Sequence, residues 1–387
     1  MKMKKTILLL SLVLMLGMPL IFISCGAPTP STPITLSATS TPVITSTPTN
    51  TSTPGWKYVG GAGFSPGSAS PVVLAFNNSG TPYVGFSDGA NSGKAYVMYY
   101  NGSSWQNVGT EDFSTGGTNW LSLAFNGSFP FLAYEDLGSS SANVMDSSGG
   151  NWSSLGSANF TTGANFYNSL VFNGTTPYLA YRDGVSGKAN VMQYNGTNWA
   201  SLGSANFSPG VASFCSLAFN GTTPYVAFED GANSNMASVM TYNGTNWANV
   251  GSAGFSAGAV TFTSLAFNGI TPYVAFEDVA NSNKATVMSY SAGTWSVVGT
   301  AGFSAGTVNS CSLAFYNGNP YIAYLDTSLS SKAVVMMYNG ANWVNVGTAG
   351  FSSGSALSPS LAFNGSTPYV AFEDGANGSK ASVMAYY

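Results

Sequence analysis

Histidine is absent from this chain of 387 residues. Without an imidazole group, the sequence excludes a Ser-His-Asp triad, a histidine metal site and a histidine general base. Charge is also scarce, because only 6% of the residues are charged, against roughly 25% in an average globular domain. Neutral Gly, Asn, Ser and Thr residues must therefore keep the protein in solution. Such a composition suits an extracellular setting better than a charge-steered cytosolic one.

Basic side chains are few, and three of the ten lie within the first five residues. An apolar run over 7–23 follows them, and then the tripeptide Ser24-Cys25-Gly26, which is the order of a secretory signal. This order resembles the lipobox of bacterial lipoproteins, in which the signal is cut before the cysteine and the new N-terminus is lipidated. An ordinary cleaved signal and an uncleaved membrane anchor are the alternatives.

The resemblance implies a signal peptide over 1–24, lipidation of Cys25, and a place in the bacterial cell envelope, at the outer membrane or cell surface, held by lipid alone. Residues 25–55 continue as a Thr/Ser/Pro tract without charge, which predicts a semi-rigid stalk in front of 56–387. Loss of the signal leaves seven basic against fourteen acidic side chains, a net charge of −7. That balance argues against nucleic acid as a partner.

Seven tryptophans recur every 47 to 49 residues, and each opens a W-x-x-[VL]-G segment. They are Trp56, Trp105, Trp152, Trp199, Trp247, Trp295 and Trp343. Between them the chain repeats F-[ST]-x-G, a variable stretch, S-L-A-F-N-G, P-Y-V-A-F-E-D and K-A-x-V-M-x-Y-N-G. The fourth copy has apolar runs at 216–219, 224–230, 237–242 and 247–250, with hairpin turns such as Asn220-Gly221 between them. Large side chains alternate with small ones, which suits sheets buried on both faces.

Four-stranded meanders at this period predict an all-β fold, a seven-bladed β-propeller with four antiparallel strands per blade over 56–387. The repeats open with a fourth-type strand at Trp56 and stop after a third-type strand, so we predict that the N-terminal strand completes the last blade and closes the ring. The WD dipeptide, the kelch Gly-Gly doublet and the sialidase Asp-box do not occur. W-x-x-V-G preceded by Y-N-G-T is somewhat similar to tectonin-type lectin repeats, and that resemblance implies sugar binding.

Every copy ends its second strand with an aspartate, and five copies carry a lysine five or six residues later. We interpret each aspartate as an acceptor for the backbone amides of its turn, neutralised by the lysine across the hairpin. The aspartates are Asp88, Asp136, Asp183, Asp230, Asp278, Asp326 and Asp374, and the lysines are Lys94, Lys188, Lys284, Lys332 and Lys380. A calcium loop at Asp230–Asn235 is an alternative interpretation.

A glycosidase pair is a second alternative, because Glu135, Glu229, Glu277 and Glu373 each precede one of these aspartates. Adjacent strand residues face opposite sides, however, so one Glu-Asp dipeptide cannot present both carboxylates to one substrate. Cys215 and Cys311 stand at the same place in copies four and six, with a blade between them, which is too far for a disulfide. We predict two small buried side chains there, and we expect no metal, no cofactor and no catalysis.

The copies differ most between F-[ST]-x-G and S-L-A-F, a stretch that we expect to link the outer strand of one blade to the inner strand of the next. By topology it lies on the same rim as the Asp-bearing turns. Aromatic residues gather in this stretch in copies two to five, at Trp120, Phe166, Tyr167, Phe214 and Phe262. Flat apolar surfaces with polar rims suit sugars and many peptides. Alternatively, the rings are buried and plug the centre.

The sequence thus favours a monomeric, surface-displayed binding module that holds a glycan, or an extracellular or envelope protein, through the five aromatic residues. Two hypotheses compete with it. One is a scaffolding lipoprotein that contacts proteins through broad polar surfaces. The other is a carbohydrate-active enzyme built on the same face.

Overall fold

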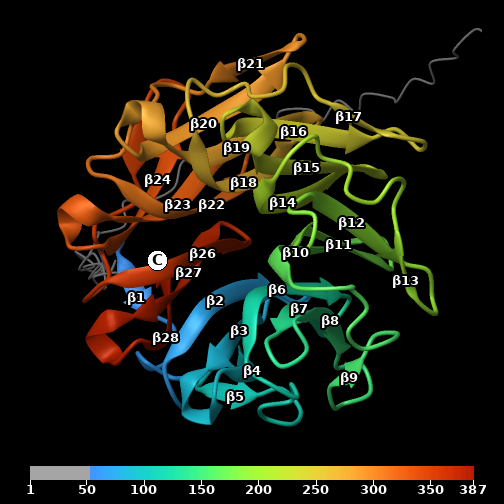
Figure 1. Ribbon diagram of the computed structural model, residues 1–387. Coiled ribbons are helices and arrows are strands. Elements are labelled where there is room, and N and C mark those ends of the chain that lie inside the picture. The colour runs from blue at the N-terminus through green and yellow to red at the C-terminus, as the bar shows by residue number, and fades with distance from the viewer. Residues whose placement is uncertain (1–52) are drawn as a thin grey trace, which may run out of the picture. The chain divides into compact units, whose positions relative to one another are not determined.

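The computed structural model describes residues 53–387, which form seven four-stranded antiparallel sheets arranged in a ring (Figure 1). The predicted seven-bladed β-propeller is therefore confirmed. The predicted signal peptide, the lipidation site at Cys25 and nearly all of the stalk lie outside the described residues. Across 53–387, none of the helices has the length and apolar character needed to cross a membrane.

The first strand of each blade lies nearest the centre of the ring, and the fourth strand lies at the outside (Figure 1). The first strands are β2 (Ala69–Phe76), β6 (Thr118–Asn126), β10 (Asn165–Asn173), β14 (Ala212–Asn220), β18 (Val260–Asn268), β22 (Val308–Tyr316) and β26 (Ala356–Asn364). The second strands are β3 (Pro82–Asp88), β7 (Phe129–Asp136), β11 (Thr176–Asp183), β15 (Thr223–Asp230), β19 (Thr271–Asp278), β23 (Asn319–Asp326) and β27 (Thr367–Asp374).

The third and fourth strands of each blade lie toward the outside of the ring. The third strands are β4 (Lys94–Tyr100), β8 (Ser141–Asp146), β12 (Ala189–Tyr194), β16 (Met236–Tyr242), β20 (Lys284–Ser291), β24 (Lys332–Tyr338) and β28 (Lys380–Tyr386). The fourth strands are β5 (Trp105–Asn107), β9 (Ser153–Ser154), β13 (Trp199–Ser201), β17 (Trp247–Asn249), β21 (Thr294–Val297), β25 (Trp343–Asn345) and, for the last blade, β1 (Trp56–Tyr58). Five single-turn 3-10 helices, η1 (Gly89–Asn91), η2 (Gly231–Asn233), η3 (Val279–Asn281), η4 (Thr327–Leu329) and η5 (Gly375–Asn377), join second to third strands.

The ring closes as the repeat phase predicts. Strand β1 pairs antiparallel with β28, with Trp56 opposite Tyr386, and the amide of Gly55 donates to the carbonyl of Tyr387 at 2.7 Å. The first strands β2 and β26 are in contact, as are the first strands of the other neighbouring blades. The N-terminal strand therefore completes the blade that β26, β27 and β28 begin.

The repeated tryptophans join each blade to the one before it. Each indole Nε1 donates to a backbone carbonyl of the preceding blade at 2.7 to 2.9 Å, and each ring stacks on the phenylalanine of the F-[ST]-x-G segment. The glycine of W-x-x-V-G makes room for this contact. At Gly347, with φ +72°, a Cβ would lie 3.2 Å from Cδ1 of Trp56 and 2.6 Å from the ring of Tyr386 beside it.

The core is divided among the junctions between blades, and each junction packs large side chains against small ones. Between blades four and five, Leu265 and Phe276 of the fifth blade pack on Ala227, Ala237 and Val239 of the fourth. The serine of S-L-A-F adds a polar link, because its Oγ accepts from the leucine amide of the next blade, as Ser216 does from Leu265 at 2.9 Å. The interleaved packing predicted from the alternation is confirmed.

Candidate functional site

The sequence predicts that the variable stretch links two blades, and this prediction is wrong. The stretch lies inside the first strand of each blade. Pairing continues through it, since Thr118 and Asn119 pair with Asp136 and Glu135. Between Asn119 and Ser122 the register shifts, and two residues of β6 face one residue of β7. This is a β-bulge, which bends a strand and redirects its side chains. Five of the other first strands carry the same bulge, and in β2 the shift comes one residue earlier, between Ala69 and Val72.

Four of the five predicted aromatic residues occupy one equivalent position, the first residue of the bulge. They are Trp120, Tyr167, Phe214 and Phe262, in four consecutive blades, and we call them the aromatic arc. Each has a positive φ between 51° and 57°, a conformation that is costly for side chains of this size. Phe166 lies one residue earlier and pairs with Arg182. Ser310 and Ser358 share this positive φ, so the conformation comes from the bulge itself. The presence of four large rings in so unfavourable a conformation favours a functional reason for them.

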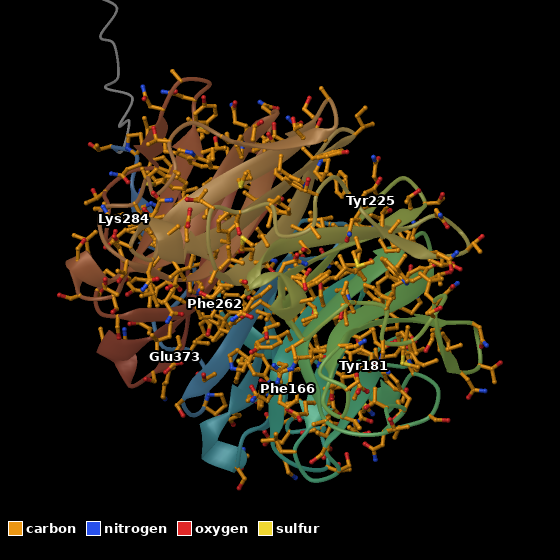
Figure 2. The ribbon with its side chains drawn as sticks, turned by 45° about the horizontal axis from the view of Figure 1, so that its top comes forward. Phe166, Tyr181, Tyr225, Phe262, Lys284 and Glu373 are labelled. Carbon is orange, nitrogen blue, oxygen red and sulfur yellow. The ribbon has the colours of Figure 1, made fainter. Side chains whose placement is uncertain are left out.

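The members of the aromatic arc contact one another in chain order. Ring centroids lie 4.4 Å apart between Trp120 and Tyr167, 4.6 Å between Tyr167 and Phe214, and 4.7 Å between Phe214 and Phe262. Phe166 meets Trp120 edge-on at 6.2 Å. Figure 2 shows Phe166 and Phe262 toward the middle of the domain. All five rings are half-buried, so they are neither a sealed plug nor fully exposed.

The other three blades have small residues at the arc position, namely Pro71, Ser310 and Ser358. A cavity of about 280 Å³ opens between the aromatic residues and the small residues. Its lining includes Tyr167, Phe214 and Phe262 on one side and Ser310 on the other, with the bulge residues Cys215 and Cys311 in its wall. The mouth of the ring is therefore asymmetric, with an aromatic side and a small polar side.

Cys215 and Cys311 are both free thiols, as the sequence predicts. Cys215 is buried, whereas Cys311 is half-buried. Burial raises the pKa of the Cys215 thiol to about 12 and raises the pKa of Cys311 as well. Both side chains are therefore protonated near neutral pH and serve as wall residues of the cavity.

Buried polar atoms without a hydrogen-bond partner concentrate next to the aromatic arc. Residues 53–387 contain six such side-chain atoms, and four of them lie on β6, β10 and β11. These four are Nε1 of Trp120, Oδ1 of Asn165, Nδ2 of Asn168 and Nε of Arg182. Asn165 is fully buried, and the only side-chain hydrogen bond found for it within the described residues runs from Nδ2 to Oδ1 of Asn168, 2.6 Å away. Unsatisfied buried groups are costly, so their clustering marks a strained region beside the aromatic arc, in which each of these atoms is itself covered by protein.

Arg182 packs on two of the aromatic rings. Its guanidinium carbon lies 4.3 Å from the ring centroid of Phe166 and 5.3 Å from that of Tyr167. Nη1 makes one long hydrogen bond of 3.4 Å to Oγ of Ser213. Stacking on aromatic faces leaves the edge of a guanidinium group free to donate.

Glutamates flank the arginine on neighbouring blades. Burial raises the pKa of Glu135, Glu229 and Glu277, while smaller effects act in the opposite direction. For Glu229 the opposing effect is the positive charge of Arg182. For Glu277 it is a hydrogen bond of 2.8 Å from Oγ1 of Thr261. The mouth thus combines aromatic rings, one cation and partly desolvated carboxyl groups.

All seven repeated aspartates are buried, and six of them accept from backbone amides of their turns, as predicted. Asp278 is the exception, because its carboxylate bonds only to side chains and its Oδ1 has no partner among the described residues. In Asp230, Oδ1 accepts from the amide of Ala232 at 3.0 Å, and Oδ2 accepts from Asn233 Nδ2 and Ser238 Oγ at 2.8 Å each. These bonds leave little for calcium, and no group of three Cys, Asp or Glu residues in the described range could hold a metal ion. The predicted rim placement is confirmed, since Ala212 pairs with Asp230 beside the bulge.

The predicted neutralisation by lysine is wrong. Lys284 lies directly opposite Asp278 in the register, but the carboxylate bonds to Asn281 and Thr286 instead. None of the hydrogen bonds found for the seven carboxylates within 53–387 comes from a lysine. Neutral donors satisfy a buried carboxylate without the desolvation of an ammonium group, so the lysines stay at the surface.

A larger hollow of about 520 Å³ lies at the opposite rim, between the first and last blades, against Pro82, Tyr100 and Tyr369. The equivalent residues Pro224, Tyr242 and Tyr178 line a hollow between blades three and four. The feature recurs because the tyrosines of P-Y-V and Y-N-G recur in the copies. It is therefore a consequence of the repeat, whereas the aromatic arc departs from the repeat.

The site residues predicted from the sequence do not include Arg182, Asn165 and Asn168. A signal for Arg182 was present, because it is the only arginine of the chain and it replaces the glutamate of E-D in the third copy. The asparagines gave no such signal, since asparagine is common throughout the repeats. Their significance comes from burial and from missing partners, which only the structure shows.

Comparison with protein-family models gives no match, and comparison with curated protein sequences gives none either. Solved structures do match. An ulvan lyase of polysaccharide lyase family PL25, bound to -[GlcA(1-4)Rha3S]-, aligns with a TM-score of 0.56 at 13% identity over 84% of this chain and 95% of its own. The SapL1 lectin in complex with alpha methyl fucoside aligns with a TM-score of 0.50 at 13% identity, over 73% of this chain and 97% of its own.

A prolyl endopeptidase aligns with a TM-score of 0.52 at 13% identity, over 84% of this chain and half of its own. These three proteins include a lyase, a lectin and a peptidase. At such identities the likeness is one of fold alone, so this chain is similar to propellers of several functions.

Proposed function

We propose that the protein is a surface-displayed binding module that holds a glycan at the aromatic arc. The observation that carries the proposal is the meeting of half-exposed rings with the guanidinium group of Arg182, which makes one long hydrogen bond within the described residues. A saccharide has apolar ring faces that pack on aromatic side chains, and hydroxyl groups that donate and accept hydrogen bonds. One ligand class would thus satisfy both features. The same fold in the SapL1 lectin and the ulvan lyase is compatible with this ligand class.

Binding is favoured over catalysis because the aspartate carboxylates are engaged by their own turns, as Asp230 illustrates. A glycosidase would therefore depend on glutamates of different blades, each held in a separate local environment. In the envelope, lipidation of Cys25 and the stalk would place the propeller at the surface. Labelling of cells with radioactive palmitate tests this location, since Cys25→Ala should abolish both the label and membrane retention.

The glycan proposal is tested on an array of bacterial and plant polysaccharides with the double variant Trp120→Ser/Tyr167→Ser. Serine already occupies this position at Ser310 and Ser358, with the same positive φ, so the fold should persist. We expect a loss of about tenfold or more in affinity, because two rings leave the site. The control is Phe129→Ser, which removes a 48% exposed ring at the other end of the same blade.

Equal retention of glycans by the wild type and the double variant would refute the proposal. The scaffolding alternative predicts a different result. Chemical cross-linking of envelopes would then recover one stoichiometric protein partner, with no saccharide retained by the purified propeller.

A further inference from the structure

The single arginine of the chain occupies a position that is acidic in four other blades. By strand register, Arg182 is equivalent to Glu135, Glu229, Glu277 and Glu373, and to Ser87 and Leu325 in the two remaining blades. Arg182 therefore puts a positive charge at the mouth of the ring, where the equivalent residue of four other blades is a glutamate. It lies in the blade that also carries two adjacent aromatic residues, Phe166 and Tyr167.

The surroundings of Arg182 position its guanidinium group but do not neutralise it by a direct contact. Phe166 and Tyr167 hold the plane by stacking, and Nε is buried without a partner. The one hydrogen bond found for it within the described residues goes to the neutral hydroxyl of Ser213. Glu229 is near enough for its pKa to feel the arginine, yet it accepts no hydrogen bond from it in this structure. Nε is covered by protein, but Nη2 and the second hydrogen of Nη1 have no partner among the described residues, so at least two donors of the rigid fork are free.

Rigid guanidinium forks match planar or tetrahedral oxyanions in a bidentate manner. A neutral sugar hydroxyl would satisfy a single donor and leave the rest of the fork unpaired. The net charge of the protein does not attract anions over long distances, since acidic side chains outnumber basic ones. Recognition would have to be local.

We propose that Arg182 binds the anionic group, a carboxylate or a sulfate, of an acidic saccharide whose ring packs on the aromatic arc. This inference rests on the proposed glycan-binding function and narrows its ligand class. Arg182 acts as the specificity-determining residue, while the arc contributes affinity that does not depend on charge. A charged saccharide and its neutral counterpart should therefore differ in affinity at this site.

The test uses two matched pairs of immobilised polysaccharides at physiological ionic strength. Polygalacturonic acid and its methyl ester differ in the carboxylate, and dextran sulfate and dextran differ in the sulfate. Each is offered to the wild type, to Arg182→Glu and to the arc variant Phe214→Ser. Glutamate fits position 182, because Glu229 occupies the same place in the next blade. Lys284→Glu is the matched control, since it makes the same change in net charge at the edge of the domain (Figure 2).

We expect the wild type to bind the charged member of at least one pair about tenfold more tightly than the neutral member. Arg182→Glu should remove that preference, Lys284→Glu should keep it, and Phe214→Ser should weaken both members. The pair that shows the preference identifies the anion.

Equal binding of charged and neutral members, with Phe214→Ser still weakening both, would overturn this inference and leave the glycan proposal standing. An equal loss in Arg182→Glu and Lys284→Glu would also overturn it, because the effect would then be one of net charge. If no saccharide on the array is bound, or if binding is unaffected by Phe214→Ser and by the double arc variant, the proposed function itself fails and the inference fails with it.

Discussion

The indole Nε1 of Trp56 donates to the carbonyl oxygen of Val346, which is 2.7 Å away and 290 residues later in the chain. The ring of Trp56 also stacks on Phe351, with centroids 4.0 Å apart. Trp295 makes the same two contacts inside the ring, with Val250 and Phe255, and is half-buried to a similar degree. The closing junction is therefore built like an ordinary junction between blades.

We expect Trp56→Ala and Trp295→Ala to lower the free energy of unfolding by similar amounts, about 3 kcal/mol each. Each variant loses a stacked ring and a hydrogen bond to a carbonyl. Guanidinium chloride denaturation, followed by far-ultraviolet circular dichroism, measures both. A ring left open at its N-terminal strand would give a different outcome, with Trp295→Ala destabilising and Trp56→Ala close to wild type.

One junction lacks the serine link that joins the other six. Val73 stands where the other blades have the serine of S-L-A-F, and the cross-strand partner of Val73 is Gly85 where the others have alanine. A Cβ on Gly85 would lie 3.1 Å from Cγ2 of Val73 and 3.0 Å from Cδ1 of Leu132. The two departures from the repeat compensate each other, because the larger valine needs the smaller glycine opposite it.

The double variant Val73→Ser/Gly85→Ala restores the pattern of the other blades. We expect it to stabilise the protein by about 1 kcal/mol, since the introduced hydroxyl oxygen would accept from the amide of Leu123. Gly85→Ala alone should destabilise by about 1 kcal/mol or more through overpacking. A double-mutant cycle in denaturant measures the coupling. Additive effects of the two changes would show that positions 73 and 85 do not compensate.

The fold was predictable because the same physical demand recurs at every junction. Each tryptophan needs a carbonyl and a phenylalanine from its neighbour, and each large face needs a small face, so the sequence repeats them. The closed ring was predictable because the last repeat lacks a fourth strand, and the strand that begins at Trp56 is of that type. These inferences depend on residue type and period alone.

The site was only partly predictable. The aromatic residues were visible as departures from the repeat, but the bulge at Trp120 was not, because one extra residue in a strand has no signature in a variable segment. The link expected there was consequently wrong. The orphan atoms of Asn165 and Asn168 depend on three-dimensional neighbours. The lysine neutralisation predicted for Asp278 is wrong because the neutral donors of Asn281 and Thr286 bond to its Oδ2.

The backbone strain of the aromatic arc gives a prediction about stability. Phe262 has φ +53°, a conformation that glycine adopts without cost. In Phe262→Gly, relief of about 1 kcal/mol in the backbone should offset the lost contact with Phe214, so the free energy of unfolding should change by less than about 1 kcal/mol. The fully buried Phe276 of the same blade is the control, and Phe276→Ala should cost about 4 kcal/mol. Comparable losses in both variants would mean that Phe262 is a core residue rather than a site residue.

The carboxylate of Asp136 gives a prediction about pH. Burial alone would raise the pKa of Asp136, but hydrogen bonds from Thr115 and from the amides of Ser139, Gly138 and Gly116 outweigh it and lower the pKa below its ordinary value. A carboxyl group with a lowered folded-state pKa adds stability that is complete above the unfolded value, near 3.9, and is lost as pH falls through the folded value.

Thr115 Oγ1 donates to Asp136 Oδ2 at 2.6 Å, and Thr115→Val removes this bond. We expect Thr115→Val to lower the free energy of unfolding by about 1 kcal/mol at pH 7. The difference from wild type should shrink below about pH 4, because the carboxylate protonates there in both proteins and the bond to its charged form no longer counts. Thr162→Val is the matched control, since Asp183 of its blade takes its hydrogen bonds from Val185 and Ser186. Urea denaturation between pH 2.5 and 7 measures the effect, and a deficit in Thr115→Val that stays constant over that range would mean that its cause is packing and not the charge of Asp136.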